Sequence, residues 1–322
     1  MLYPMKFRPI LKSAIWGGEK IIPYKGLSLS QEKVGESWEL SGVSGQESII
    51  ANGEFEGVSI VELLQKHGAE LIGQANYQRF GDEFPLLIKF IDARDDLSIQ
   101  VHPDDELAAK RHNSKGKTEM WYVVDTDKGA KLRSGFSREV SAEEYVQSVE
   151  EDCVTDLLQE YQVNKGDLFF LPAGRIHSIG AGCFIAEIQQ TSNITYRIYD
   201  FNRTDDQGNP RELHTSLAKD AIDYSVEADY RTHYDREAKN QEVKLVACDY
   251  FKTSLYDLDC HTTLNLAELE SFIILICVEG AAQITCADTT LDLRQGETVL
   301  IPASATKLEI ATSGAKILTT HI

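Results

Sequence analysis

A weak internal repeat of eight residues, with copies 130 positions apart in this 322-residue chain, constrains the fold more than any other feature of the sequence. Residues 166–173 are Gly-Asp-Leu-Phe-Phe-Leu-Pro-Ala, and residues 296–303 are Gly-Glu-Thr-Val-Leu-Ile-Pro-Ala. Each copy predicts a turn, then a short apolar strand that ends at a proline. The apolar runs 120–124 and 272–276 form a second matching pair. We therefore predict two similar β-barrels or sandwiches.

The rest of the sequence is typical of a mostly β protein with helical insertions. Apolar and polar residues alternate in short runs separated by Gly, Pro, Asn and Asp. Capping boxes that begin at Ser59 and Ser141 predict helices within insertions near residues 59–80 and 139–162, the second helix running toward Tyr161. Helical spacing of apolar residues predicts a further helix over 213–224.

A segment rich in charge and poor in apolar residues, 227–242, divides the chain. We place an N-terminal domain at residues 1–235 and a C-terminal domain at residues 240–322.

The charge of the chain limits its partners. Fifty-one acidic against 32 basic side chains give a net charge of −19, which opposes binding to nucleic acid or to an anionic membrane. The sequence has neither an apolar run of the roughly 18 residues that span a membrane nor the apolar core of a signal peptide. The six cysteines are scattered without a C-x-x-C pair and are expected to be free thiols. We expect a cytoplasmic protein, a monomer or a weak homo-oligomer.

Four side chains are candidates for a metal site. On a predicted strand, Gln100 and His102 share one face, and on the next Glu119 shares a face with Trp121. Burying a carboxylate among apolar side chains costs free energy unless the carboxylate is paired or binds a metal. His177 follows a tight turn that would direct it into a barrel. Taken singly, each histidine is more typical of a surface or hydrogen-bonded core residue. Together the four suit zinc with an open position, and two histidines with one carboxylate equally suit non-haem Fe(II).

A second cluster follows in the sequence. Glu187 is the only charge in the apolar strand 183–189, and Arg197 lies on a strand shortly after it. The two could simply pair with each other. Alternatively, the carboxylate transfers a proton or orients a ligand, and the guanidinium binds phosphate. Lys117 shares a face with Glu119 and would add a second positive charge.

These segments resemble the type I mannose-6-phosphate isomerases, most closely their short bacterial form. The motifs that carry the resemblance are Trp16-Gly17-Gly18, Gly35-Glu36-Ser37-Trp38-Glu39, Gln100-Val101-His102-Pro103, Lys117-Thr118-Glu119-Met120-Trp121-Tyr122, Gly174-Arg175-Ile176-His177, Tyr196-Arg197-Ile198-Tyr199-Asp200 and Arg211-Glu212-Leu213-His214. They occur in the order of that family, within residues 1 to about 224. The remainder, from about residue 240, resembles the degenerate second cupin of the same family.

The resemblance implies a bimodular cupin fold, two jelly-roll barrels with a helical insertion. It implies one zinc ion per chain and interconversion of mannose 6-phosphate and fructose 6-phosphate. The zinc ligands would be Gln100, His102, Glu119 and His177, and the active site would include Arg197, Lys117 and Glu187.

The chemistry of such a reaction leaves two roles open. A proton moves between C1 and C2 through an enediol, and Glu187, Lys117 or a zinc-bound hydroxide could carry it. Arg197 would contact either the phosphate or the enediolate. We expect it near the reacting carbons, on a strand adjacent to that of Glu187, with Arg175 as a further positive charge around the site.

Two other functions compete with the isomerase. One is an Fe(II) cupin oxygenase that uses His102, Glu119 and His177. The other is a sugar-phosphate-binding cupin without catalytic activity. Gln100 as a fourth ligand, and Lys117 and Arg197 as binders of phosphate, favour the isomerase.

Overall fold

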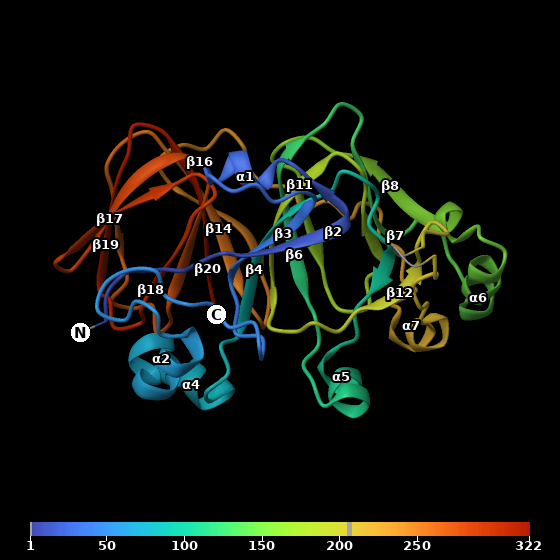
Figure 1. The fold of residues 1–322 in the computed structure, drawn as a ribbon, viewed down its shortest axis with the longest axis horizontal. Coiled ribbons are helices and arrows are strands. Elements are labelled where there is room, and N and C mark those ends of the chain that lie inside the picture. The colour runs from blue at the N-terminus through green and yellow to red at the C-terminus, as the bar shows by residue number, and fades with distance from the viewer. Residues whose placement is uncertain (1, 205–207) are drawn as a thin grey trace.

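Both copies of the repeated segment form β-strands, one in each of two barrels that lie side by side (Figure 1). The computed structural model describes residues 2–204 and 208–322. The first copy contributes β9 (Leu168–Leu171), which pairs antiparallel with β6 (Glu119–Thr126). The second contributes β18 (Thr298–Ile301), which pairs in the same way with β16 (Ile273–Cys286). The prediction of two similar barrels in a mostly β chain is confirmed.

The N-terminal barrel consists of two facing antiparallel sheets. A six-stranded sheet has the order β2-β3-β4-β11-β6-β9, and a five-stranded sheet has the order β12-β5-β10-β7-β8. The remaining strands of the first are β2 (Ile10–Gly18), β3 (Val34–Leu40), β4 (Leu86–Asp92) and β11 (Cys183–Gln190). Those of the second are β12 (Tyr196–Tyr199), β5 (Ile99–Val101), β10 (His177–Ile179), β7 (Lys131–Phe136) and β8 (Leu158–Gln162).

The C-terminal barrel includes the N-terminus of the chain. The short strand β1 (Met5–Lys6) pairs with β18, so that Met5 lies opposite Leu300. The long strand β16 takes part in both halves of this barrel. The other strands are β13 (Glu242–Ala247), β14 (Lys252–Leu258), β15 (Thr262–Asn265), β17 (Thr289–Arg294), β19 (Lys307–Ala311) and β20 (Ala315–His321).

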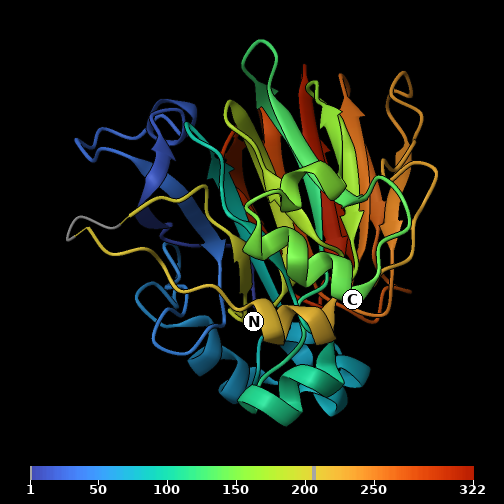
Figure 2. The same cartoon turned by 90° about the vertical axis from the view of Figure 1, so that its right-hand side faces the viewer.

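Seven α-helices occur among the described residues, mostly below the barrels or beside the N-terminal one (Figures 1 and 2). They are α1 (Ile21–Tyr24), α2 (Ile60–His67), α3 (Ala69–Ile72), α4 (Gln74–Phe80), α5 (Asp105–His112), α6 (Ala142–Glu150) and α7 (Thr215–Ala221). None of them combines the length and the apolar composition that crossing a membrane requires.

The predicted helices are confirmed in part. Ser59 caps α2 with the expected capping box, and positive φ angles of 43° and 94° at Gly68 and Gly73 divide that insertion into three short helices. The helix predicted from Ser141 toward Tyr161 is wrong in its second half. It ends at Glu150, and a 3₁₀ turn leads into β8, because residues 158–162 pair with β7 instead.

Strand alternation buries both faces of the six-stranded sheet. In β6, Met120 and Tyr122 pack in the apolar layer shared with the C-terminal barrel, whereas Trp121 and Val123 face the interior of the N-terminal barrel. The shared layer also contains Phe184 of β11. The two barrels therefore form one continuous packed structure.

The second barrel lacks the candidate ligands at corresponding positions. Glu119 lies opposite Leu171 in the first barrel, and its counterpart opposite Ile301 in the second is Ile273. Lys307 begins β19 five residues after the proline of the repeat, as His177 begins β10, and it pairs with Glu309. These two positions of the second barrel therefore carry no candidate metal ligand.

We expect Phe184→Ala to destabilise the protein by about 3–5 kcal/mol, the usual cost of removing a buried aromatic ring. Phe184 is 1% exposed, and its ring packs edge-on against the ring of Tyr24, with 4.7 Å between the two ring centroids. Urea unfolding measures the change, with Leu29→Ala, at a residue that is 55% exposed, as the control. A loss below about 1 kcal/mol would contradict the packed layer between the barrels.

Candidate active site

Three of the predicted ligands converge inside the N-terminal barrel. His102 follows β5, Glu119 begins β6 and His177 begins β10, and all three side chains are buried. The Nε2 atom of His102 lies 3.5 Å from Oε2 of Glu119, and Nε2 of His177 lies 3.4 Å from Oε1. Two tetrahedral ligand atoms about 2.0–2.2 Å from a metal are roughly 3.3–3.6 Å apart. The spacing therefore suits a single metal ion.

Both imidazoles are held in the form that binds metals. Nδ1 of His102 lies 3.0 Å from the carbonyl oxygen of Ile194, and Nδ1 of His177 lies 2.8 Å from that of Arg175. A carbonyl oxygen only accepts, so each Nδ1 donates a proton and each Nε2 presents a lone pair. Burial lowers the pKa of His102 well below its ordinary value and that of His177 to about 3. Both rings are neutral at neutral pH.

The Glu119 carboxylate is fully buried and incompletely satisfied. Its Oε1 atom has no hydrogen-bond donor among the residues that the structure describes. Burial, and then the charge of Glu187, raise the pKa of Glu119, while Lys117 opposes this with its ammonium group 2.9 Å from Oε2. A cation between Glu119 and the two imidazoles would satisfy the carboxylate, so these residues fit a bound metal.

Gln100 and Lys117 complete the cluster. The side-chain amide of Gln100 lies 3.2 Å from Nε2 of His177, and exchanging its oxygen and nitrogen would present a ligand oxygen to the same point. Lys117 is buried, with Nζ 3.1 Å from Nε2 of His102. The structure thus brings all four predicted ligands and Lys117 together.

Glu187 lies in a row of paired side chains across the six-stranded sheet. In register, Lys89 of β4 and Trp121 of β6 flank it. Nζ of Lys89 lies 3.0 Å from Oε1 of Glu187, and the Trp121 indole donates to Oε2 at 2.9 Å. Burial alone would raise the pKa of Glu187, but Lys89 and Lys117 outweigh it and lower the pKa, so the carboxylate is ionised. Sequence reasoning missed Lys89, although a lone lysine within the apolar run 86–91 signals a buried partner.

Arg197 lies on the opposite sheet from Glu187. The two do not pair with each other, and the expectation of adjacent strands is wrong, because the chain crosses from one sheet to the other between β11 and β12. Arg197 lies opposite Gln100 on β5. His214 fixes its backbone, accepting from the Arg197 amide at 3.0 Å and donating its own amide to the Arg197 carbonyl at 2.7 Å. His214 is thus a structural contact of Arg197.

Arg175 does not line the site. Its guanidinium pairs with Glu227 and lies over the ring of Tyr230, 4.3 Å from the centroid. The expectation that it adds positive charge around the substrate is therefore wrong: the turn before His177 directs only the histidine inward.

A cavity of about 350 Å³ adjoins the ligand cluster. Two carboxylates, Glu36 and Glu187, and two lysines, Lys89 and Lys117, line one side, and side chains from the opposite sheet and the loops next to it line the other. These are Ser98, Gln100, Asn193, Thr195, Arg197 and Arg211. The volume lies within the range of small-ligand sites, and charged donors dominate the lining. The cavity suits a small anionic molecule with many hydroxyl groups.

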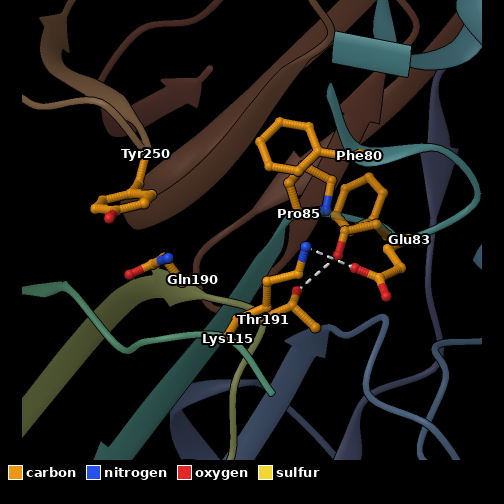
Figure 3. Close-up of a pocket in the computed structure, with 8 residues that line it drawn as sticks. Phe80, Glu83, Pro85, Lys115, Gln190, Thr191 and Tyr250 are labelled. Atoms are coloured by element: carbon orange, nitrogen blue, oxygen red, sulfur yellow. Dashed lines mark hydrogen bonds and ion pairs between the residues drawn. The ribbon is translucent and has the colours of Figure 1, made fainter. Parts of the chain in front are cut away.

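A second pocket, outside the barrel, is too small and too well paired to be a binding site (Figure 3). Its volume of about 30 Å³ holds little more than one water molecule. Lys115 pairs with Glu83 at 3.0 Å, and the Thr191 hydroxyl donates to the carbonyl of Phe84. We therefore place the chemistry in the larger cavity.

Comparisons with known proteins agree over the whole chain. The family model described as phosphomannose isomerase type I, catalytic domain, matches residues 5–151, and that of the mannose-6-phosphate isomerase cupin domain matches residues 241–321. Mannose-6-phosphate isomerase ManA of Bacillus subtilis is 33% identical over 301 residues, 93% of each chain. A Streptococcus mutans mannose-6-phosphate isomerase is 32% identical over 302 residues, 94% of this chain and 93% of its own. A crystal structure of the mannose 6-phosphate isomerase from Bacillus subtilis matches with a TM-score of 0.88 at 31% identity over 99% of both chains.

We expect Lys89→Met to destabilise the protein by about 3–5 kcal/mol, because it leaves the Glu187 charge buried without its main partner. The double variant Lys89→Met/Glu187→Gln should recover part of this loss in a double-mutant cycle of urea unfolding. The loss of stability in Lys89→Met should become smaller as the pH falls below about 4.5. The pKa of Glu187 is lowered in the folded protein, so its ionised form stabilises the fold above the unfolded-state pKa, and this stabilisation is lost as Glu187 is protonated.

The matched control for this cycle is Lys307→Met, which breaks the exposed pair with Glu309 and should cost at most about 1 kcal/mol. A coupling between Lys89 and Glu187 no larger than that of the exposed pair would contradict the buried ion pair.

Proposed function

The chain belongs to the type I mannose-6-phosphate isomerase family, and we propose that it interconverts mannose 6-phosphate and fructose 6-phosphate with one zinc ion. Gln100, His102, Glu119 and His177 would hold the ion. The observation that carries the proposal is the convergence of neutral imidazoles and a buried carboxylate beside a cavity lined by lysines, arginines and Glu187.

The metal would supply Lewis acidity at the sugar oxygens without redox chemistry of its own. The protein's own side chains would donate hydrogen bonds to the developing charge and transfer the proton. Lys117 lies between His102 and Glu119 and can donate to the oxygen on which charge develops as the proton leaves carbon. Glu187, ionised and held by Lys89 and Trp121, can take a proton from C2 and return it to C1. Arg197, opposite Gln100, can donate to the enediolate from the other sheet.

The cavity disfavours the two alternatives. An Fe(II) oxygenase needs open metal positions and has no use for four cations, Lys89, Lys117, Arg197 and Arg211, around its substrate. A binding protein without activity has no need of a complete ligand set together with an ionised carboxylate. Iron in the purified protein with consumption of O₂ would favour the first, and binding of sugar phosphate without conversion would favour the second.

We expect His102→Ala to weaken zinc binding by at least about 100-fold and to abolish conversion of mannose 6-phosphate, because it removes a ligand of the ion. Zinc content after dialysis and the appearance of fructose 6-phosphate, with and without a chelator, measure both effects. His233→Ala, at a side chain that is 76% exposed, is the control and should change neither. Full zinc occupancy in His102→Ala would remove this residue from the site, and a zinc-loaded wild type without turnover would overturn the proposed function.

We expect Glu187→Gln to lower kcat by about 10²–10⁴-fold with unchanged zinc content, because the amide cannot accept the proton from carbon. Exchange of the C2 hydrogen with solvent deuterium, followed by NMR, should fall in parallel. Turnover and exchange within about threefold of the wild type would assign the proton transfer to another group.

A further inference from the structure

Arg211 lines the cavity, and neither the sequence motifs nor the proposed mechanism gives it a role. It lies at the end of the cavity away from His102. Arg197 is opposite Gln100 on β5, whereas Tyr199 is opposite Ile99, so Asp200 and the Arg211 bound to it lie farther toward Ser98. The cavity thus has a metal-ligand end and an arginine end.

Asp200 holds Arg211 in a fixed orientation. Nε of Arg211 donates to Oδ2 of Asp200 at 2.6 Å, and Nη2 donates to Oδ1 at 2.5 Å. Asp200 is only 4% exposed, and its Oδ1 also accepts from Arg203 at 2.5 Å. Two parallel hydrogen bonds fix the plane of a guanidinium group. Among residues 2–204 and 208–322, the structure shows no acceptor for Nη1 of Arg211, and the residue lines the cavity.

Among the residues that the structure describes, arginine side chains outnumber buried carboxylates around Asp200. Arg197, Arg203 and Arg211 surround the single buried carboxylate of Asp200, and the side chain of Glu212 is 83% exposed. Nε of Arg197 is buried without a hydrogen-bond acceptor in the described part of the chain. Burial, and then the nearby charge of Arg211, lower the pKa of Arg197. A phosphate, with up to two negative charges and acceptor oxygens for planar donors, would balance this excess.

The distance between the two ends suits a sugar phosphate. Ser98 and Gln100 both line the cavity from β5 and the residues before it, and two residues of a strand span about 6.6 Å. An extended six-carbon sugar with phosphate near Ser98 and Arg211 would place its first two carbons near Gln100 and Glu187. We propose that Arg211, oriented by Asp200, binds the phosphate group of the substrate and makes the enzyme specific for phosphorylated sugars. This inference rests on the proposed function and names the residue that selects the substrate class.

The test compares Arg211→Gln and Arg211→Lys with the wild type. Arg211→Gln should raise KM for mannose 6-phosphate by about 10- to 100-fold, the usual worth of a hydrogen bond to a charged group, with kcat little changed. The inhibition constant of orthophosphate should rise by a similar factor, whereas any turnover of unphosphorylated mannose should not change. Arg211→Lys keeps the charge and should rescue part of the loss. Arg138→Gln, at an exposed guanidinium that pairs with Glu144 and does not line the cavity, is the control and should leave KM unchanged.

Two results would overturn the inference. One is an Arg211→Gln variant with unchanged KM and unchanged orthophosphate inhibition. The other is an equal loss of turnover on mannose and on mannose 6-phosphate, since that would indicate a general structural role. If the wild type does not isomerise mannose 6-phosphate, the proposed function fails. Calorimetric titration with orthophosphate then tests separately whether Arg211 forms a phosphate site. Binding by the wild type that Arg211→Gln loses would support the phosphate site, and equal or absent binding in both would refute it.

Discussion

The burial of Glu119 is the constraint on which the site depends. A carboxylate with no exposed surface in an apolar barrel is stable only when cations or strong donors surround it. Lys117, His102 and His177 lie within 3.5 Å of its oxygens, and they come from three separate segments of the chain. Antiparallel pairing of β5 with β10 and the position of β6 in the facing sheet keep these groups in place. The register of the strands therefore determines the geometry of the ligands.

The second barrel covers the outer face of the sheet that carries Glu119 and Glu187. With Ile273 at the position of Glu119, its interior needs no compensating charge and packs as an apolar core. Its outer surface covers the six-stranded sheet of the first barrel. The outer face of that sheet is therefore buried. Lys89 and Glu187 lie on its inner face and line the cavity, and because both side chains are almost fully buried, their ion pair is stronger than an exposed pair.

Period-two alternation and the turn before His177 were enough to predict the faces of Gln100, His102 and Glu119, because these depend on local geometry. Long-range pairing was not predictable in the same way. Lys89 finds Glu187 only through the register of β4 with β11, almost a hundred residues later in the chain. The prediction that Glu187 and Arg197 occupy adjacent strands was wrong. Although only ten residues separate them, the chain crosses from one sheet to the other between β11 and β12. Residues 158–162 likewise form a strand paired with β7, although the capping box at Ser141 had predicted that the helix continues toward them.

The uneven charge of the cavity reconciles an acidic chain with an anionic substrate. At physiological salt a charge is screened beyond about 8 Å, so most of the surface acids act weakly on a ligand inside the barrel. Within it, the carboxylates of Glu119 and Glu187 lie toward the metal-ligand end, Arg197 lies opposite Gln100, and Arg211 lies farther toward Ser98. A molecule with one anionic end can enter this field in only one favourable orientation. Binding energy from the phosphate, remote from the reacting carbons, would then hold C1 and C2 between Lys117 and Glu187, where proton transfer takes place.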